Sequence, residues 1–197
     1  MIINSAIMNY LNQNNNIITT SQFIALGYSK ALLFKYEKAG LLARVSHGVY
    51  SSKDVVVDDL FEIAKRSNNI VVSHESALFL NGLSDRTPFI HSVTIPSGKK
   101  LPASIKDKCI CFYIKNELFK TGLIELKTTF GNSVQCYNPE RTVCDLLRSR
   151  SRIDEETVIS ALKNYVASPV KDLNLLSDYS KQFGLEKKIR TYMEVLL

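Results

Sequence analysis

Residues 19–51 constrain the fold of this chain more than any other stretch, because cap and turn residues divide them into short, ordered elements. A hydroxyl residue opens each of two helices and a glycine closes each, which are the usual preferences at helix ends. In chain order these residues are Thr19, Gly27, Ser29 and Gly40. Two short apolar runs with a break between them fill residues 41–51. The order of helix, turn, helix and hairpin predicts a winged helix-turn-helix, whose second helix enters a DNA major groove.

Positive charge is concentrated in the same stretch. Residues 1–52 hold four cations and one acid, whereas the other 145 residues hold 21 cations and 18 acids, so each part carries a net charge of +3. The four cations are Lys30, Lys35, Lys38 and Arg44. Contacts from such clustered cations to phosphates supply much of the affinity for DNA. Taken alone, these cations could also form a solvated helix face, but the order of the elements favours DNA binding.

The expected DNA-binding residues lie on the second helix and at the tip of the wing. They are Ser29, Lys30, Lys35, Lys38, Arg44, Ser46 and His47. We expect Ser29 and Lys30 near base edges or the first phosphates, and Lys35 in the groove. We expect Lys38 on the phosphate backbone, and Arg44 at a phosphate or in a narrow minor groove.

The sequence after residue 52 predicts a second domain that contains both strands and helices. Strand-like runs are expected at 90–95, 109–114, 123–129 and 133–137, and helices at 58–66, 73–81, 139–148, 154–166, 168–183 and 185–197. The predicted fold class is therefore α+β, with a winged helix-turn-helix followed by a mixed α/β domain and a helical tail. The predicted domains are residues 1–52 and 53–197.

Composition limits the other classes of function. At 197 residues and 45% hydrophobic, the chain has no apolar run long enough to span a membrane and no positively charged signal sequence. A cytoplasmic protein without a membrane partner is expected. The four cysteines are Cys109, Cys111, Cys136 and Cys144. They form no C-x-x-C pair, so we expect reduced thiols, no metal, no cofactor and no catalytic residue.

Three segments of the chain carry recognisable motifs. Residues 40–50 have the pattern G-x-L-x-R-x-x-x-G-V-Y in the predicted wing. The other two segments are Ser-His-Glu-Ser-Ala-Leu at residues 73–78, and Pro-Glu-Arg-Thr-Val-Cys-Asp-Leu-Leu at residues 139–147. Together these segments resemble the AbiEi-type antitoxins of the abortive-infection AbiE systems. All three occur in the expected order, whereas the last 45 residues carry no matching motif.

The resemblance implies a bacterial two-gene toxin–antitoxin system. In this family the winged helix represses the antitoxin's own operon by binding inverted repeats in the operator DNA. The second domain takes part in neutralising a nucleotidyltransferase-like toxin. The pairing is of type IV, in which no stable complex between antitoxin and toxin is required. A non-enzymatic regulator in phage defence is thus the expected function.

The second and third motifs allow structural and functional interpretations. Their polar members are Ser73, His74, Glu75, Glu140, Arg141 and Asp145. Ser73 could cap a helix whose N-terminus Glu75 favours. Glu140 and Arg141 could be surface charges, or they could join Asp145 in an ion-pair network or a docking face. The structural interpretation is favoured over a direct functional one.

Two rival functions remain open from the sequence. Glu125 and Lys127 on a predicted strand match the acid-x-lysine element of a large nuclease superfamily, with Asp107 as the nearest further Mg²⁺ ligand. The chain could also be a plain winged-helix regulator whose second domain senses a ligand or a partner. The segment Gly98-Lys99-Lys100 lacks the other glycine and the hydroxyl of a phosphate-binding loop.

Overall fold

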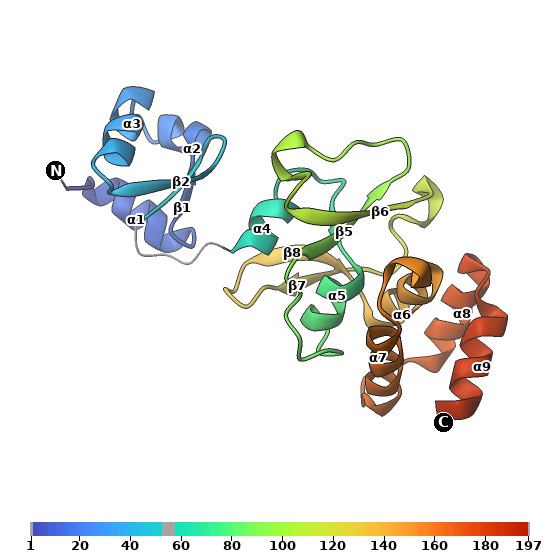
Figure 1. The fold of residues 1–197 in the computed structure, drawn as a ribbon. Helices are drawn as coiled ribbons and strands as arrows, with labels where there is room; N and C mark the ends of the chain where they lie inside the picture. Colours follow the sequence, from blue (N-terminus) through green and yellow to red (C-terminus); the bar gives the residue numbers. More distant parts are fainter. Residues whose placement is uncertain (1, 53–57, 197) are drawn as a thin grey trace. The chain divides into compact units, whose positions relative to one another are not determined.

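The computed structural model describes residues 2–52 and 58–196. The chain divides into two compact units, Met1–Asp59 and Leu60–Leu197, and each has its own apolar core. The predicted boundary after Ser52 adjoins residues 53–57, which lie outside the described residues, and it stays a prediction. The fold class is α+β, as the sequence predicts (Figure 1).

The first unit is a winged helix-turn-helix (Figure 1). Its elements are α1 (Ser5–Gln13), β1 (Ile17–Thr19), α2 (Thr20–Ala25), α3 (Lys30–Lys38), β2 (Leu42–Ser46) and β3 (Val49–Ser52). The strands form an antiparallel sheet in the order β1-β3-β2. The prediction omits β1, because three residues are too few to show an alternation of apolar and polar side chains.

Helix spacing brings the apolar residues of this unit into one core. Ile7 and Leu11 lie one turn apart on α1, and Leu33 and Tyr36 lie one turn apart on α3. All four are buried together with Phe23 of α2. The core leaves the opposite face of α3 in solvent.

The predicted helix caps are present. The Thr19 Oγ1 accepts a hydrogen bond from the Gln22 backbone N at 3.2 Å, and the Gln22 Oε1 accepts one from the Thr19 N at 2.8 Å. This reciprocal pair is a capping box, which satisfies two backbone donors at the start of α2. The Ser29 Oγ accepts from the Leu32 N at 3.3 Å and so caps α3. These caps fix where the two helices begin.

The second unit contains a five-stranded mixed sheet. It begins with α4 (Asp59–Ala64), β4 (Val71–Val72), α5 (His74–Leu80), β5 (His91–Pro96), β6 (Cys109–Ile114), β7 (Leu123–Lys127) and β8 (Ser133–Tyr137). Short 3-10 turns lie at η1 (Ala103–Ile105), η2 (Asn116–Leu118) and η3 (Arg150–Arg152). The strand order is β6-β5-β4-β8-β7, so β6 and β7 are the two edges (Figure 1). The pairs β4–β8 and β5–β6 are parallel, and the pairs β4–β5 and β7–β8 are antiparallel.

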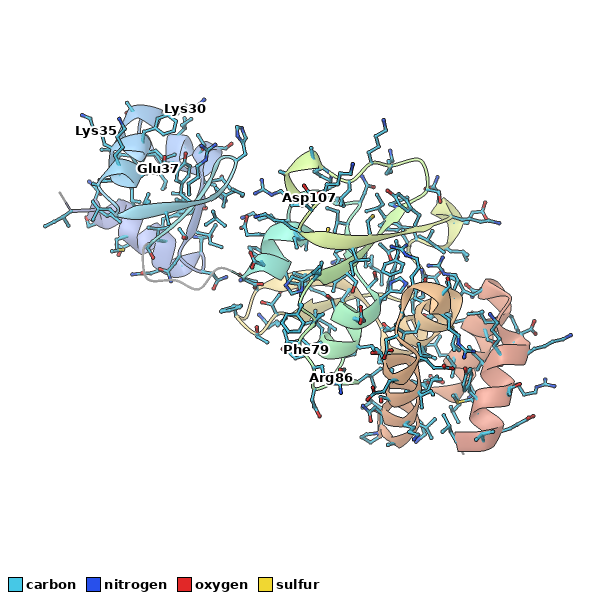
Figure 2. All side chains as sticks on the ribbon, viewed as in Figure 1. Lys30, Lys35, Glu37, Phe79, Arg86 and Asp107 are labelled. Carbon is cyan, nitrogen blue, oxygen red and sulfur yellow. The ribbon has the colours of Figure 1, made fainter. Side chains whose placement is uncertain are left out.

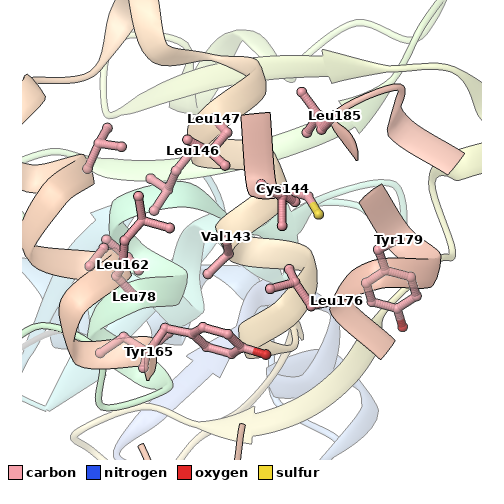
Figure 3. Packing of buried hydrophobic residues seen from close by; sticks show 14 of the residues in the cluster. Leu78, Val143, Cys144, Leu146, Leu147, Leu162, Tyr165, Leu176, Tyr179 and Leu185 are labelled. Carbon is pink, nitrogen blue, oxygen red and sulfur yellow. The ribbon is translucent and has the colours of Figure 1, made fainter. Parts of the chain in front are cut away.

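A helical tail completes the second unit and contains its largest apolar cluster. The helices are α6 (Pro139–Arg148), α7 (Glu155–Ala167), α8 (Leu173–Phe183) and α9 (Glu186–Leu196). Figure 3 shows residues from three of these helices, including Cys144, Leu162 and Leu176, packed against Leu78 of α5. This packing covers most of α6, whose residues 140–147 are all buried. None of the described helices is long and apolar enough to cross a membrane.

One predicted helix start is wrong. Ser168 is the C-cap of α7, and its N–H donates to the Tyr165 carbonyl at 3.1 Å instead of opening a helix. The next helix begins at Leu173, because the Asp172 Oδ1 caps it by accepting from the Leu175 N at 2.9 Å. By contrast, Asn138 caps α6 as predicted, with Pro139 at its first position.

Candidate nucleic-acid interface and a buried ionic cluster

The outer face of α3 carries three exposed lysines. Lys30, Lys35 and Lys38 are all exposed, and Figure 2 shows Lys30 and Lys35 projecting from the helix. The side chain of Phe34, between them, is 48% exposed. The hydroxyl of Ser29 is occupied in capping the helix, so Ser29 is placed at the N-terminus that the sequence predicts. This face has the charge and the apolar contact surface that a helix in a DNA groove requires.

The wing is tied to the start of α2. The Gly48 carbonyl accepts hydrogen bonds from the Thr20 N at 2.8 Å and from the Thr20 Oγ1 at 3.3 Å. Gly48 has a φ of +73°, a left-handed conformation that a tight hairpin turn requires and glycine adopts without strain. The hairpin tip is therefore anchored directly to the helix-turn-helix.

Three polar residues lie at the tip of this wing. Arg44 and His47 are exposed and Ser46 is half-buried. The Arg44 Nη2 lies 3.2 Å from the His47 Nδ1, which fixes the guanidinium near the turn. The pairing of β2 with β3 shifts between Arg44 and Ser46. Such a bulge re-aims side chains at a strand end.

Residues 2–52 contain four cations, and none of them is neutralised by a carboxylate of the same stretch. Within residues 2–52, none of Lys30, Lys35, Lys38 and Arg44 forms an ion pair with a carboxylate. Each is therefore available to replace a counterion at a phosphate. The structure thus presents every predicted DNA-binding residue at the helix or wing position expected, whereas contact with DNA stays a prediction.

The second motif forms a buried polar chain around His74. The His74 Nδ1 lies 2.9 Å from the Ser73 Oγ, and its Nε2 lies 2.9 Å from the Ser149 Oγ. The Ser73 Oγ also accepts from the Thr94 Oγ1 at 2.8 Å. The imidazole stacks on Phe112 with ring centroids 3.5 Å apart. Ser73 occupies the N-cap position of α5, as the sequence predicts, but its hydroxyl bonds within this polar network and makes no side-chain cap bond.

Burial keeps this histidine neutral. His74 is fully buried, and desolvation lowers its pKa from 6.5 to about 3. The nearby charge of Asp145 acts in the opposite direction, while the cations Arg148, Arg141 and Arg152 lower the pKa further. The backbone of His74 has a φ of +49°, an uncommon conformation for a residue with a side chain. Such local strain persists only where the surroundings hold it in place.

The third motif forms an ionic cluster inside the protein. Arg141 and Asp145 are both 0% exposed, and the Arg141 Nε donates to the Asp145 Oδ2 at 3.0 Å. The Arg141 Nη1 donates to the carbonyls of Leu118 and Thr121 at 2.7 and 3.0 Å. Arg141 therefore connects α6 by hydrogen bonds to the segment 118–121, which precedes β7. A Cβ on Gly122, which follows that segment, would lie 2.6 Å from the Arg141 Cβ, so the close approach requires glycine.

Aromatic rings enclose the same guanidinium. The Arg141 Cζ lies 4.1 Å from the ring centre of Tyr137 and 4.3 Å from that of Phe183. Its Nη2 has no hydrogen-bond partner among the described residues. On the other side of the cluster, the Arg148 Nη2 donates to the Asp145 Oδ1 at 3.1 Å. One carboxylate thus joins two arginines of α6.

Glu140 has a separate buried role. It is 4% exposed, and its Oε1 accepts from the Tyr165 hydroxyl at 3.1 Å and from the Asp172 N at 3.0 Å. It therefore connects α6 to the loop between α7 and α8. The interpretation of Glu140 and Arg141 as surface charges is wrong, because the tail helices cover this face of α6. The ion-pair interpretation fits Arg141 and Asp145.

The predicted nuclease residues are not brought together. Glu125 lies on the edge strand β7, and Asp107 precedes the opposite edge strand β6 (Figures 1 and 2). Four strand spacings separate these edges, a distance of roughly 19 Å. Ligands of one Mg²⁺ must each lie about 2 Å from the ion. Across residues 2–52 and 58–196, no group of three or more His, Cys, Asp or Glu residues could hold a metal ion.

Three of the four cysteines, Cys109, Cys136 and Cys144, are buried, and Cys111 is half-buried. All four are free. Burial raises the pKa of Cys136 and Cys144 to about 12, and that of Cys109 to about 11. Partial burial also raises the pKa of the Cys111 thiol. A thiol with a raised pKa is a poor nucleophile at neutral pH, because the reactive form is the thiolate.

Several residues of the buried cluster have no signal in the sequence. They are Thr94, Phe112, Tyr137, Ser149 and Phe183. Each comes from a different element of the fold. The separation in sequence between these residues and His74 or Arg141 therefore does not predict that they are in contact. Only the i, i+4 spacing of Arg141 and Asp145 on a predicted helix could have indicated an ion pair.

The fold and the basic helix and wing define a winged helix-turn-helix protein with an α+β second unit. Residues 6–53 match a family model described as "Transcriptional regulator, AbiEi antitoxin". The match lies within the first unit and confirms the resemblance to AbiEi-type antitoxins that the wing motif indicates.

A solved structure shares the fold over most of the chain. It is described as the crystal structure of RV2827C protein from Mycobacterium tuberculosis. The TM-score is 0.65 at 13% sequence identity, and the likeness covers 89% of this chain and 70% of that one. At this identity the likeness concerns the fold alone. No curated protein matches the sequence.

Proposed function

We propose that this protein is an antitoxin that represses its own operon through the winged helix and neutralises a nucleotidyltransferase-like toxin through its second unit. The observation that carries the first half is the set of four exposed cations on α3 and the wing, none paired with a carboxylate in residues 2–52. The antitoxin family matched at residues 6–53 supports both halves.

The DNA-binding surface consists of the seven predicted residues. Ser29 and Lys30 contact base edges or the first phosphates, Lys35 enters the major groove, and Lys38 contacts the backbone. On the wing, Arg44, Ser46 and His47 contact a flanking phosphate or the minor groove. The operator contains inverted repeats, which place two copies of the first unit on one DNA site. The cytoplasm is the compartment where such a regulator acts.

Substitution of Lys35 or Arg44 by alanine tests the surface. Loss of one phosphate contact is expected to reduce the slope of log affinity against log salt by about 0.9, and loss of a base contact to weaken binding about tenfold or more. A gel-shift titration at several salt concentrations measures both. Lys188→Ala removes an exposed lysine from α9 and is the matched control. Wild-type affinity and slope in both variants would contradict the assignment.

Neutralisation and repression can be tested together in cells that carry the toxin gene and an operator reporter. Co-expression of the full chain with the candidate toxin should restore growth, and a reporter behind the operator should be repressed. Lys35→Ala is expected to lose repression and to keep growth rescue, because the two activities lie in different units. Repression without rescue by the wild-type chain would favour the plain regulator instead.

A further inference from the structure

The five-stranded sheet of the second unit has two edges that differ in how they are covered. At β6, the Cys111 carbonyl accepts hydrogen bonds from the Arg152 Nη1 and Nη2, both at 3.3 Å. The Tyr113 carbonyl accepts one from the Arg148 Nη1 at 3.2 Å. At the other edge, β7 pairs only with β8 among the described strands (Figure 1). A sheet adds a further strand where an edge has free backbone groups, so β7 is the edge that can receive one.

The hydrogen bonds at both ends of the β7–β8 ladder show which backbone groups of β7 are free. The Gly122 carbonyl accepts from the Asn138 N at 2.8 Å. Six residues further on, the Thr128 N donates to the Asn132 carbonyl at 2.8 Å. Bonded and non-bonded pairs alternate along an antiparallel ladder. The even-numbered residues of β7 therefore bond to β8, and the odd-numbered residues point their N–H and C=O groups away from it.

Two exposed residues of β7 present these outward groups. The outward N–H and C=O groups of Glu125 and Lys127 bond to no described residue. Leu126, between them, is half-buried and packs against the core formed by α5 and β8. The Lys127 Nζ donates to the Gly131 carbonyl at 3.3 Å within the same hairpin. Because a lysine on an edge discourages pairing with an arbitrary strand, a suitable partner strand must place an acid opposite Lys127.

A second copy of β7 provides that acid. When two copies pair antiparallel with Leu126 facing itself at a twofold axis, Glu125 of each copy lies opposite Lys127 of the other. Opposite charges directly across an antiparallel pair stabilise it, and like charges destabilise it. Registers centred on Glu125 or on Lys127 place like charges opposite each other. The charge pattern of β7 is therefore complementary to itself in the register centred on Leu126.

We propose that the second unit forms a dimer in which two β7 strands pair antiparallel about Leu126. About four backbone hydrogen bonds join the strands, because each Glu125–Lys127 pair exchanges two. The antiparallel arrangement also brings the hairpin turn of one copy, where Phe130 is 48% exposed, next to the half-buried Ile124 of the other. So few anchors are typical of a small, transient interface. Pairing of this kind requires neither operator DNA nor a toxin.

Sedimentation equilibrium of the full chain from about 1 to 200 μM measures this pairing, because a weak dimer dissociates in that range. The wild type is expected to shift from monomer towards dimer as its concentration rises. Glu125→Lys and Lys127→Glu each place like charges opposite each other in both pairs, and each should weaken the dimer about tenfold or more. A mixture of the two variants restores opposite charges in both pairs, so it should form a heterodimer about as strong as the wild-type dimer.

Matched controls and a second readout locate the contact on β7. Glu186→Lys and Lys188→Glu reverse exposed charges on α9 and should leave the dimer unchanged. The backbone amides of Glu125 and Lys127 should exchange hydrogen more slowly at high than at low concentration of the wild type. Circular dichroism should be the same for all variants, since the reversed charges are exposed.

Three results would overturn the pairing. The first is a wild-type chain that stays monomeric at about 200 μM, beyond the range of a weak specific dimer. The second is a dimer that both single charge reversals leave intact, or amide exchange on β7 that does not depend on concentration. The third is a mixture of Glu125→Lys and Lys127→Glu that stays monomeric, because the register centred on Leu126 requires the mixture to pair.

Discussion

Replacement of Arg141 by methionine is expected to lower the free energy of unfolding of the second unit by about 3 kcal/mol, because it leaves the buried carboxylate of Asp145 with only the partly exposed Arg148 as its partner. Asp145 is 0% exposed and lies 3.0 Å from the Arg141 Nε. Methionine keeps an apolar stem between the rings of Tyr137 and Phe183, so the loss comes mainly from charge and hydrogen bonds, with only a small contribution from lost volume. Urea denaturation followed by circular dichroism measures the change.

Two further variants make this measurement specific to the ion pair. The double variant Arg141→Met/Asp145→Leu should lower the free energy of unfolding by less than Arg141→Met alone, because the buried carboxylate is removed as well. Arg148, which then loses its carboxylate partner, is partly exposed to solvent. Lys181→Ala breaks an exposed pair with Asp178 and should change the free energy of unfolding by less than about 1 kcal/mol. A loss of that size for Arg141→Met would contradict the view that this cluster holds the unit together.

The first unit was largely predictable because its signals are local. The Thr19 capping box, the Ser29 cap and the glycine in the wing turn each act within a few residues. Such signals specify where helices and hairpins begin and end, so the predicted elements match α2, α3, β2 and β3. The strand β1 is too short to carry a pattern, and its pairing with β3 is a contact between distant residues.

The second unit was predictable only in its elements. Sequence spacing indicates the strands β5 to β8, but not the sheet order, which places β6 and β7 at opposite edges and so separates Asp107 from Glu125. The two-residue strand β4 gives no pattern, although it joins the two halves of the sheet.

The polar motifs of this unit show the same limit at the level of single residues. Arg141 is a charged residue on an amphipathic helix, and sequence alone cannot indicate that α8 covers it. Its carboxylate partner lies four residues away, whereas its carbonyl partners, Leu118 and Thr121, precede it by about 20 residues. Burial of these charges therefore follows from tertiary packing, and it favours a structural role for the second and third motifs.

Acid is expected to destabilise the second unit through His74. The folded protein lowers the pKa of this histidine to about 3, whereas the unfolded chain restores it to about 6.5. Between these two values the unfolded state binds a proton that the folded state does not bind. The contribution of His74 to stability is therefore present above pH 6.5 and falls by about 1.4 kcal/mol for each pH unit below it.

The variant His74→Gln isolates this effect, because glutamine remains uncharged at every pH. Its free energy of unfolding is expected to be lower than that of the wild type at pH 7.5, since the stack on Phe112 and the bonds to Ser73 and Ser149 are changed. The difference should shrink as the pH falls from 6.5 towards 4.5, by roughly 2–3 kcal/mol over that range. Urea denaturation at matched pH values measures both proteins, and all carboxylates contribute equally to each curve. Parallel pH profiles would contradict this view, because they would mean that His74 has the same pKa in the folded and in the unfolded protein.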